Sequence, residues 1–321
     1  MPLLVTRREV EDLFDLTTAI DVTEAAFREQ AAGAICTQPP RMLTTPRGAL
    51  RMVSGALLQS RRMGLRAGPA MGYNADGGER MVALLWDTET GDLLGVLSHP
   101  FGTLRTGATV GLATRWFARE DAHVLGMIGT GRNALSLLTA VCHVRPIEHI
   151  RVFSRDPEHR SRFAQRAGEA LGRAIQVVDA AEKATLGADV VCVATNSLSP
   201  VLRAEQLSPG AFVATMGRPS ELDGSVYLAA GLIVVGSKEH EQDYWDPSHT
   251  HQLMELVKAG KLELAAIHEM ADVAVGRAPK RTSAGQTIVF KESQGGFGDV
   301  AFASYVYDQA RRRALGQEVD L

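Results

Sequence analysis

The chain has 321 residues, which is long enough for two domains and a large buried core. Its 34 lysines and arginines nearly balance its 37 aspartates and glutamates, so the charge indicates neither nucleic acid nor a membrane surface as a partner. Cys36, Cys142 and Cys192 are too scattered for a disulfide framework, and reduced thiols in the cytoplasm are expected. We find no apolar run of membrane-spanning length, and early charges argue against a signal peptide.

The first third of the chain mixes helical and strand-like patterns. Thr6 to Glu9 reads as a capping box, and an amphipathic helix is expected from Thr17 to Ala32 with Ile20, Ala26 and Phe27 facing inward. Parts of residues 51–98 alternate like strands, and residues 87–92 resemble a hairpin turn. Residues 102–118 become helical, and a last amphipathic helix is expected over residues 300–315.

The middle of the chain holds its most informative stretch. An apolar run of strand length, residues 123–128, breaks into Gly129-Thr130-Gly131-Arg132-Asn133-Ala134 and then into a helical pattern. In this G-x-G-x-x-A order, the first glycine makes a tight turn and the second lets the backbone approach a pyrophosphate. The small third residue packs helix on strand, and the helix N-terminus faces negative charge. The stretch predicts a dinucleotide site that includes these six residues.

The next strand, from Ile150, ends in Ser154-Arg155, with Arg160 further along the following helix. A carboxylate at such a strand end would accept the ribose hydroxyls of NAD, whereas a hydroxyl and arginines suit the additional phosphate of NADP. The pattern therefore favours NADP over NAD, although Asp156 lies beside it.

Further buried-type strands follow at residues 189–195, 211–217 and 232–236, and a helix is expected over residues 158–170. Strands of this kind that alternate with helices predict an α/β fold, a doubly wound parallel sheet with both faces covered. Thr195, Asn196 and Met216 lie at strand ends and are candidate cofactor contacts. We expect this Rossmann domain to span residues 118–297, inserted into a second, α+β domain of residues 1–117 and 298–321.

Eight pieces in order resemble the ornithine cyclodeaminase/μ-crystallin family along nearly the whole chain. They are Pro39–Arg41, Gly64–Gly68, Asp87–Gly91, Leu104–Ala108, Leu125–Ala134, Ala188–Val201, Glu221–Asp223, and Phe290-Lys291 with Asp299. The resemblance implies a Rossmann domain with a substrate-binding domain that also forms a homodimer. It further implies hydride transfer between a nicotinamide and the nitrogen-bearing carbon of a small amino acid or imine.

The resemblance places Arg41, Arg66 and Arg105 where the family holds the substrate carboxylate, and guanidinium groups bind carboxylates bidentately. Arg105 stands in a small, apolar stretch where a solvated charge is unexpected, whereas Arg41 follows two prolines in an expected loop. Thr106 and Asp299 match positions near the cofactor. Asp299 has a second reading, as a cap of the final helix.

Three departures from the family pattern bear on the chemistry. Arg66 replaces the usual lysine, and arginine does not shuttle protons. The catalytic aspartate of the cyclodeaminases is missing before Pro219. Glu292 and Gln294 replace a serine and a glycine that the family places near the nicotinamide. The first two departures favour an imine reductase or amino-acid dehydrogenase, whereas Glu292 either supplies a carboxylate to an amine substrate or is solvated. A cyclodeaminase-like ammonia lyase and a non-catalytic NADPH-dependent ligand-binding protein stay as alternatives.

One acidic segment invites a metal assignment. Glu239, His240, Glu241, Asp243, Asp246, His249 and His251 lie close together in the sequence. They lack a histidine pair one turn apart on a clear helix, so a solvated loop without a metal is expected.

Overall fold

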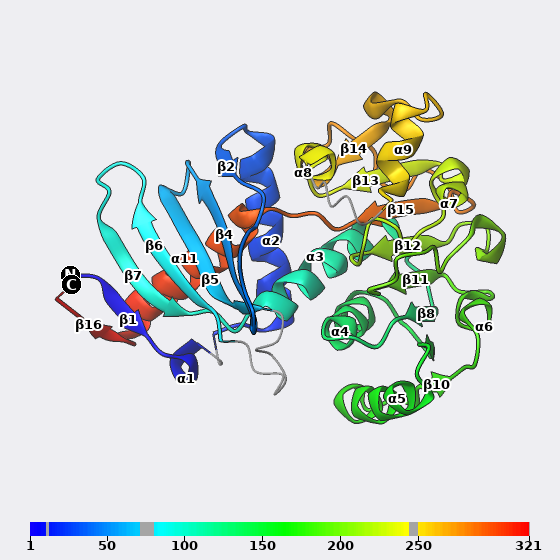
Figure 1. Ribbon diagram of the computed structural model, residues 1–321, viewed down its shortest axis with the longest axis horizontal. Helices are drawn as coiled ribbons and strands as arrows, with labels where there is room; N and C mark the ends of the chain where they lie inside the picture. Colours follow the sequence, from blue (N-terminus) through cyan, green and yellow to red (C-terminus); the bar gives the residue numbers. More distant parts are fainter. Residues whose placement is uncertain (11–12, 71–79, 244–249, 321) are drawn as a thin grey trace. The chain divides into compact units, whose positions relative to one another are not determined.

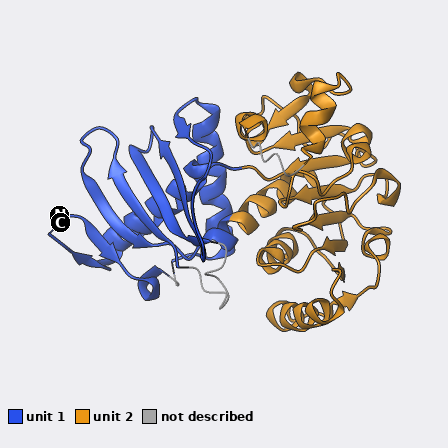
Figure 2. Ribbon diagram, in the orientation of Figure 1, with its two compact units in different colours: residues 1–105, 294–321 blue, residues 106–293 orange. Residues whose placement is uncertain are grey.

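A computed structural model describes residues 1–10, 13–70, 80–243 and 250–320. The chain forms two compact units: unit 1 comprises residues 1–105 and 294–321, and unit 2 comprises residues 106–293 (Figure 2). The first division falls inside helix α3 (Gly102–Phe117), twelve residues before the boundary expected at 117/118. Because a continuous helix crosses this division, no turn or composition change marks it in the sequence.

Unit 2 is built on a parallel sheet with strand order β10-β9-β8-β11-β12-β15-β13-β14 (Figure 1). Its strands are β8 (Val124–Ile128), β9 (His149–Phe153), β10 (Gln176–Val177), β11 (Val190–Val193), β12 (Phe212–Thr215), β13 (Leu232–Val235), β14 (Ile267–Glu269) and β15 (Ile288–Lys291). Its other helices are α4 (Ala134–Val144), α5 (Pro157–Leu171), α6 (Ala181–Thr185), α7 (Gly224–Ala229), α8 (Lys238–Asp243), α9 (Gln252–Lys258) and α10 (Met270–Ala274). The predicted doubly wound α/β sheet is confirmed.

Every residue of β8, β11, β12, β13 and β15 is buried, as expected for a sheet with both faces covered. β8 pairs with β9 on one side and with β11 on the other, so the strand order reverses at β8. In open α/β sheets, ligands bind outside the carboxyl ends of the strands at such a reversal. This edge is where the glycine turn lies.

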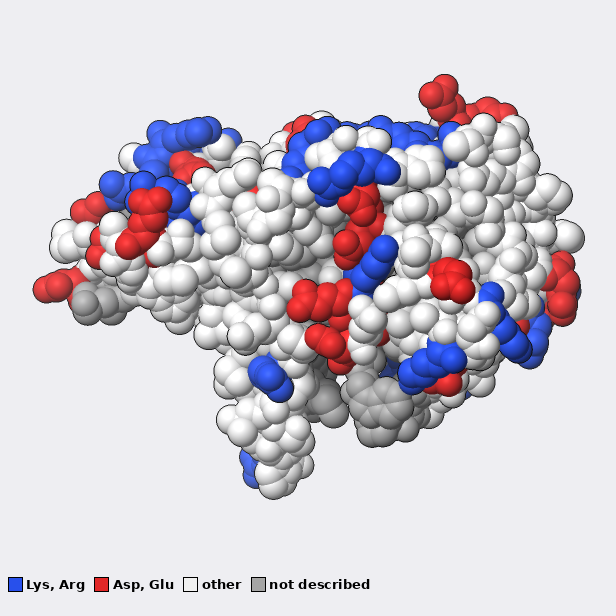
Figure 3. Space-filling view, turned by 90° about the horizontal axis from the view of Figure 1, so that it is seen from above, with Lys and Arg blue, Asp and Glu red and all other residues white. Residues whose placement is uncertain are grey.

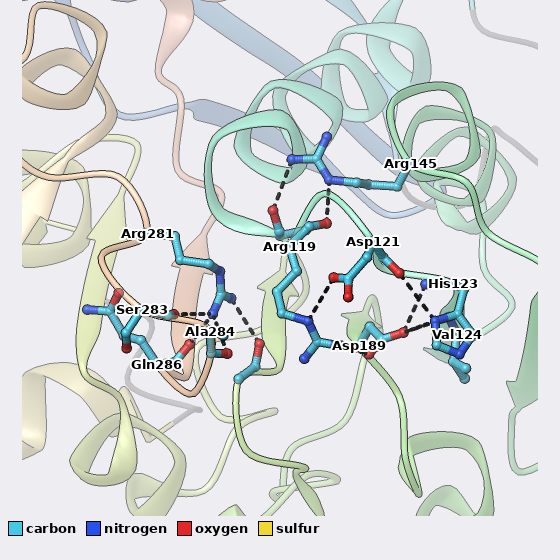
Figure 4. A network of polar contacts seen from close by, with 12 residues as sticks. Arg119, Asp121, His123, Val124, Arg145, Asp189, Arg281, Ser283, Ala284 and Gln286 are labelled. Carbon is cyan, nitrogen blue, oxygen red and sulfur yellow. Dashed lines mark hydrogen bonds and ion pairs between the residues drawn. The ribbon is translucent and has the colours of Figure 1, made fainter.

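Arginine side chains close the carboxyl end of α3, within unit 2 (Figure 4). Arg145 donates to the Arg115 carbonyl oxygen at 2.8 Å, and Arg281 donates to the Phe117 carbonyl oxygen at 2.7 Å. A helix leaves its last carbonyl groups without intrahelical partners, and a cation at this end also interacts favourably with the negative end of the helix dipole. Arg119 instead pairs with Asp189, whose carboxylate accepts the backbone N–H of Val124.

Unit 1 is a mostly antiparallel sheet with strand order β16-β1-β7-β6-β5-β4-β2, and β3 also pairs with β4. Its strands are β1 (Leu3–Val5), β2 (Ile35–Thr37), β3 (Arg41–Thr45), β4 (Gly48–Leu57), β5 (Arg62–Ala70), β6 (Val82–Asp87), β7 (Leu93–Ser98) and β16 (Gln317–Glu318). Its helices are α1 (Arg7–Val10), α2 (Leu16–Ala31) and α11 (Gly296–Arg313). The hairpin turn between β6 and β7 and the burial of Ile20, Ala26 and Phe27 on α2 are confirmed.

Helix α11 lies against one face of this sheet (Figure 1). It approaches β4 so closely that a side chain at Gly296 would collide with the Ser54 carbonyl group, and one at Gly55 would collide with the Phe297 backbone. The two glycines therefore set the depth of the helix N-terminus, which fixes the position of the first-turn residue Asp299.

The surface of the described residues carries mixed charge. On the face drawn in Figure 3, acidic and basic side chains are interspersed among uncharged ones. Among the described residues, no helix is both long and apolar enough to cross a membrane.

Candidate active site

The turn after β8 has the geometry that the glycine pattern predicts. Gly129 has φ 105°, and a Cβ there would collide with the Ala194 carbonyl oxygen at the end of β11. Only glycine fits this position without strain. A Cβ at Gly131 would meet no atom within 4 Å, so its backbone faces open space. Ala134 begins α4 and is fully buried.

A pocket of about 280 Å³ opens over this turn. Seven of the residues predicted to contact a cofactor line it: Gly129, Thr130, Gly131, Ser154, Arg155, Thr195 and Asn196. They come from the ends of β8, β9 and β11, which are adjacent strands. The Thr130 hydroxyl donates to the Ser154 hydroxyl oxygen at 3.0 Å and so links two of these strand ends.

The other predicted cofactor residues of unit 2 lie outside this lining. Arg160 contacts two residues of the pocket lining: it donates to the Ser154 carbonyl oxygen at 3.0 Å, and its guanidinium lies 5.5 Å from the centre of the Phe153 ring. Asn133 donates to the sulfur of Met216 at 3.4 Å, which brings two predicted contacts together. Arg132 is exposed in the turn, and Thr106 is buried in α3.

A second cluster of predicted residues lies in unit 1. Nε of Arg66, on β5, lies 2.9 Å from Oδ2 of Asp299, and Nε of Arg105 lies 3.2 Å from Oδ1. The side chains of Arg66, Arg105 and Asp299 are only 9%, 12% and 4% exposed. Arg105 also donates to Oε1 of Gln294 at 2.9 Å. The cap of α11 is Gly295, so the reading of Asp299 as a helix cap is wrong. Its carboxylate instead compensates two buried guanidinium charges.

Electrostatics keep this cluster ionised. Burial pushes the pKa of Asp299 upward, but the charges of Arg105 and Arg66 outweigh it and hold the pKa below its ordinary value. His99 is fully buried nearby, with Nε2 3.4 Å from the Asp299 carbonyl oxygen. Burial lowers the pKa of His99 from 6.5 to about 4, although the Asp299 charge opposes the shift. His99 is therefore neutral at pH 7.

Arg41 does not join this cluster, and the prediction that it lies in a loop is wrong. It begins strand β3, is exposed, and pairs with Met52 of β4, whereas Arg66 pairs with the next residue, Val53. Since paired residues share a face and successive residues alternate, Arg41 and Arg66 project from opposite faces of the sheet. The short β3–β4 hairpin explains the strand, because its pairing satisfies the backbone after the two prolines.

Part of the acidic segment is not a solvated loop. Residues 238–243 form α8, and the buried Glu241 carboxylate lies 3.0 Å from Nε2 of the buried His251. Burial raises the pKa of Glu241, but the charges of Lys291 and His251 outweigh it and lower that pKa. These partners offset the cost of burying a carboxylate. The prediction of a solvated loop was wrong because the sequence does not show that these partners lie beside Glu241. Asp246 and His249 lie outside the described residues, and those described contain no group of three or more His, Cys, Asp or Glu side chains that could hold a metal ion.

Sequence reasoning missed His99 and the central place of Asp299. His99 follows the half-buried Ser98 at the end of β7 and precedes a proline, and neither neighbour indicates that the histidine itself is buried. The signals for Asp299 were its match to a family position near the cofactor and its place near the start of a helix, which suits a cap equally well, and neither indicates two arginine partners.

The parallel sheet with a glycine turn at its strand-order reversal defines a Rossmann-type dinucleotide-binding fold. Residues 1–314 match the model of the ornithine cyclodeaminase/mu-crystallin family, and the chain belongs to this family. The Delta(1)-pyrroline-2-carboxylate reductase of Bacillus cereus is 33% identical over 245 residues, which cover 74% of this chain and 74% of that protein.

Solved structures also resemble the whole chain, among them the two that follow. The Delta(1)-pyrroline-2-carboxylate reductase of Thermococcus litoralis, in complex with NADH and L-proline, has a TM-score of 0.87 and 27% identity and covers 99% of this chain and 100% of its own. An archaeal alanine dehydrogenase dimer with bound NAD has a TM-score of 0.85 and 28% identity and covers 100% of this chain and 99% of its own.

Proposed function

We propose that this protein is an NAD(P)-dependent oxidoreductase that acts on the C=N or CH–NH carbon of a small amino-acid-like substrate. The observation that carries the proposal is the pocket over Gly129 and Gly131 at the strand-order reversal. Relatives named as a pyrroline-2-carboxylate reductase and an alanine dehydrogenase support the reaction class. Unit 2 would bind the cofactor, and unit 1 would bind the substrate.

The pocket suits a dinucleotide. Gly131 leaves its backbone open to a pyrophosphate, and the N-terminus of α4 supplies favourable partial positive charge. Ser154 and Arg155 would contact the adenosine half of the dinucleotide, and Thr195 and Asn196, which line the same pocket, would also contact the cofactor. When bound, the nicotinamide supplies or accepts the hydride.

The paired arginines of unit 1 would bind the substrate carboxylate. Arg66 and Arg105 are held by Asp299 and are largely buried, so little side-chain freedom is lost when a carboxylate binds. Neither arginine transfers a proton at neutral pH. An iminium already carries its activating charge, and an imine can take its proton from solvent, so reduction needs no further acid from this pair.

The test is a panel of imines with NADPH and NADH. Cyclic imine carboxylates, and 2-oxo acids mixed with ammonia or methylamine, would each be followed for cofactor oxidation and ammonia release. We expect one cofactor oxidised per amine formed. A cyclodeaminase would release ammonia without net cofactor consumption, and a ligand-binding protein would bind cofactor without turnover.

We also propose a preference for NADP. Arg155 lines the pocket beside Ser154, where it could bind the additional phosphate of NADP, although Asp156 is adjacent. The Asp156 carboxylate caps α5 by accepting a hydrogen bond from the His159 backbone N–H. This hydrogen bond partly compensates the negative charge of Asp156. The ratio of kcat/KM for NADPH to that for NADH should exceed one and should fall by about tenfold in Arg155→Ala. An unchanged ratio would contradict the preference.

A homodimer is the assembly that unit 1 favours. Strand register places Leu4, Leu43, Leu50, Met63 and Val82 on the sheet face opposite α11, and each is more than a third exposed. Exposed apolar side chains that share one face of a sheet favour an interaction site on that face. A second copy is the occupant we propose, since the similar alanine dehydrogenase is a dimer.

Light scattering tests the assembly. Leu43→Lys combined with Leu50→Lys should produce monomers, whereas Leu186→Lys, at an exposed leucine of unit 2, should leave the dimer intact. A monomeric wild-type protein would contradict the assembly.

A cytoplasmic location is also proposed, because all three cysteines are free thiols.

A further inference from the structure

A buried carboxylate hydrogen-bonds to a residue that lines the pocket of unit 2. Glu221 follows β12, its side chain is fully buried, and its two oxygens accept four hydrogen bonds. Oε2 accepts from the backbone N–H of Thr195 at 2.8 Å and from its hydroxyl at 2.9 Å. Oε1 accepts from the backbone N–H of Gly217 at 2.7 Å and from the Thr215 hydroxyl. One side chain thus ties the end of β11 to the turn after β12.

This arrangement is costly for a carboxylate. Burial raises the pKa of Glu221, while its hydrogen-bond donors and the charge of the buried Lys291 favour the ionised form. Glu221 is tightly packed, because a side chain at Gly217 would collide with Glu221 and with the Thr195 carbonyl oxygen. Such a costly group is retained where it fixes a geometry that the backbone alone does not hold.

The segments that Glu221 joins are the ones that border the pocket. Thr195 lines the pocket together with its neighbour Asn196, and Gly217 follows Met216, whose sulfur accepts from Asn133 in the glycine turn. Movement of either strand end would therefore displace pocket atoms. Backbone hydrogen bonds of the sheet stop at this edge, so the carboxylate continues the cross-strand linkage beyond the last ladder bond.

We propose that Glu221 is a positioning residue that holds the ends of β11 and β12 together as one wall of the cofactor site. This inference rests on the proposed function in one respect, that the pocket binds the dinucleotide. Glu221 acts through Thr195 and Gly217 and is not a catalytic residue.

The chain offers a matched control in Glu241. Its carboxylate is also buried in unit 2 and also senses the charge of Lys291, but it pairs with His251, which does not line the pocket. Glu221→Gln introduces an amide NH₂ where donors already point, so at least one of the four hydrogen bonds must break. Glu241→Gln makes the same chemical change at a comparable depth.

The experiment measures the Kd of NADPH and NADH by fluorescence titration, together with Tm, for the wild-type protein and both variants. We expect Glu221→Gln to weaken cofactor binding by about tenfold or more, with KM for the imine nearly unchanged. Glu241→Gln should lower Tm and leave the cofactor Kd within about twofold. A merely structural role for Glu221 would lower Tm in both variants without separating their Kd values, and that result would overturn the proposal.

Three further outcomes are decisive. If Glu221→Gln does not fold, Thr215→Val takes its place, since it removes only one hydrogen bond to Glu221 at a buried position outside the pocket lining. It should weaken cofactor binding in the same direction, and an unchanged Kd would overturn the proposal. If the wild-type protein binds neither nucleotide, the proposed cofactor site fails and the inference fails with it. Wild-type binding with an unaltered Glu221→Gln variant would overturn the inference alone.

Discussion

Nε of Arg66 lies 2.9 Å from Oδ2 of Asp299, and both side chains are almost completely buried. The same carboxylate also pairs with Arg105, so one acidic group holds two guanidinium groups in place. A buried ion pair of this kind contributes little net stability but is expensive to break, because the surviving charge is left uncompensated.

Asp299→Asn should lower the free energy of unfolding by about 3 kcal/mol, because two buried guanidinium groups lose their charged partner. Chemical denaturation measures the change. Asp308→Asn is the control on the same helix, since Asp308 is 46% exposed and pairs with Arg62 at the surface, where ion pairs contribute less than about 1 kcal/mol. Equal losses in the two variants would show that the buried network is not needed for stability.

Arg105→Ala should lower kcat/KM for the carboxylate substrate by about a hundredfold, through a higher KM or a lower turnover. The reason is that the proposed carboxylate clamp, Arg66 and Arg105, loses one of its two cations. The Kd of NADPH should stay within about threefold of the wild-type value, since Arg105 belongs to unit 1 and the glycine-turn pocket to unit 2. Steady-state kinetics and fluorescence titration measure the two effects. Unchanged turnover with every carboxylate substrate would remove Arg105 from the clamp.

The two glycines of the turn should respond differently to alanine. Gly129→Ala forces a side chain into the Ala194 carbonyl group at positive φ, so we expect a lower Tm and no cofactor binding. Gly131→Ala meets no protein atom within 4 Å, so its Tm should match that of the wild-type protein. Its methyl group would occupy the space proposed for the pyrophosphate and weaken cofactor binding about tenfold or more. Full cofactor affinity in Gly131→Ala would place the pyrophosphate elsewhere.

His99 should make the fold sensitive to acid. Its pKa is about 4 in the folded chain against 6.5 ordinarily, so between these values the unfolded chain binds a proton that the folded chain does not. Stability is therefore fully present above pH 6.5 and is lost as the pH falls towards 4, by roughly 3 kcal/mol. Denaturation of the wild-type protein and His99→Gln at several pH values should show a stability difference that shrinks with acid. Parallel curves would contradict the buried, neutral histidine.

The sequence predicts the parallel sheet of unit 2 well, because its strands are short, apolar and separated by helices of clear pattern. The glycine turn can also be predicted from the sequence, because the φ of 105° at Gly129 is a local requirement that favours glycine. The clamp is only partly predictable. Residue type and family resemblance select three arginines. The face from which Arg41 projects depends on strand register, which the β3–β4 hairpin near one edge of the sheet determines.

Long-range partners are harder to foresee. Asp299 and Arg66 are distant in sequence and meet because α11 packs closely on the sheet at Gly55 and Gly296. The buried Glu221 was visible only as part of a matching motif, because its four donors come from three separate positions that the fold brings together. Charged residues are assigned to the surface by default, and only the folded chain reveals the partners that permit their burial.

Transfer of a labelled hydride tests the central claim most directly. NADPH or NADH carrying deuterium at the transferable position of the nicotinamide would be incubated with the protein and a cyclic imine carboxylate, and the amino-acid product would be analysed by mass spectrometry and NMR. The account predicts one deuterium on the carbon that bears the nitrogen, with one cofactor oxidised for each product molecule. Unlabelled product, or no net oxidation of either cofactor across the imine panel, would contradict it.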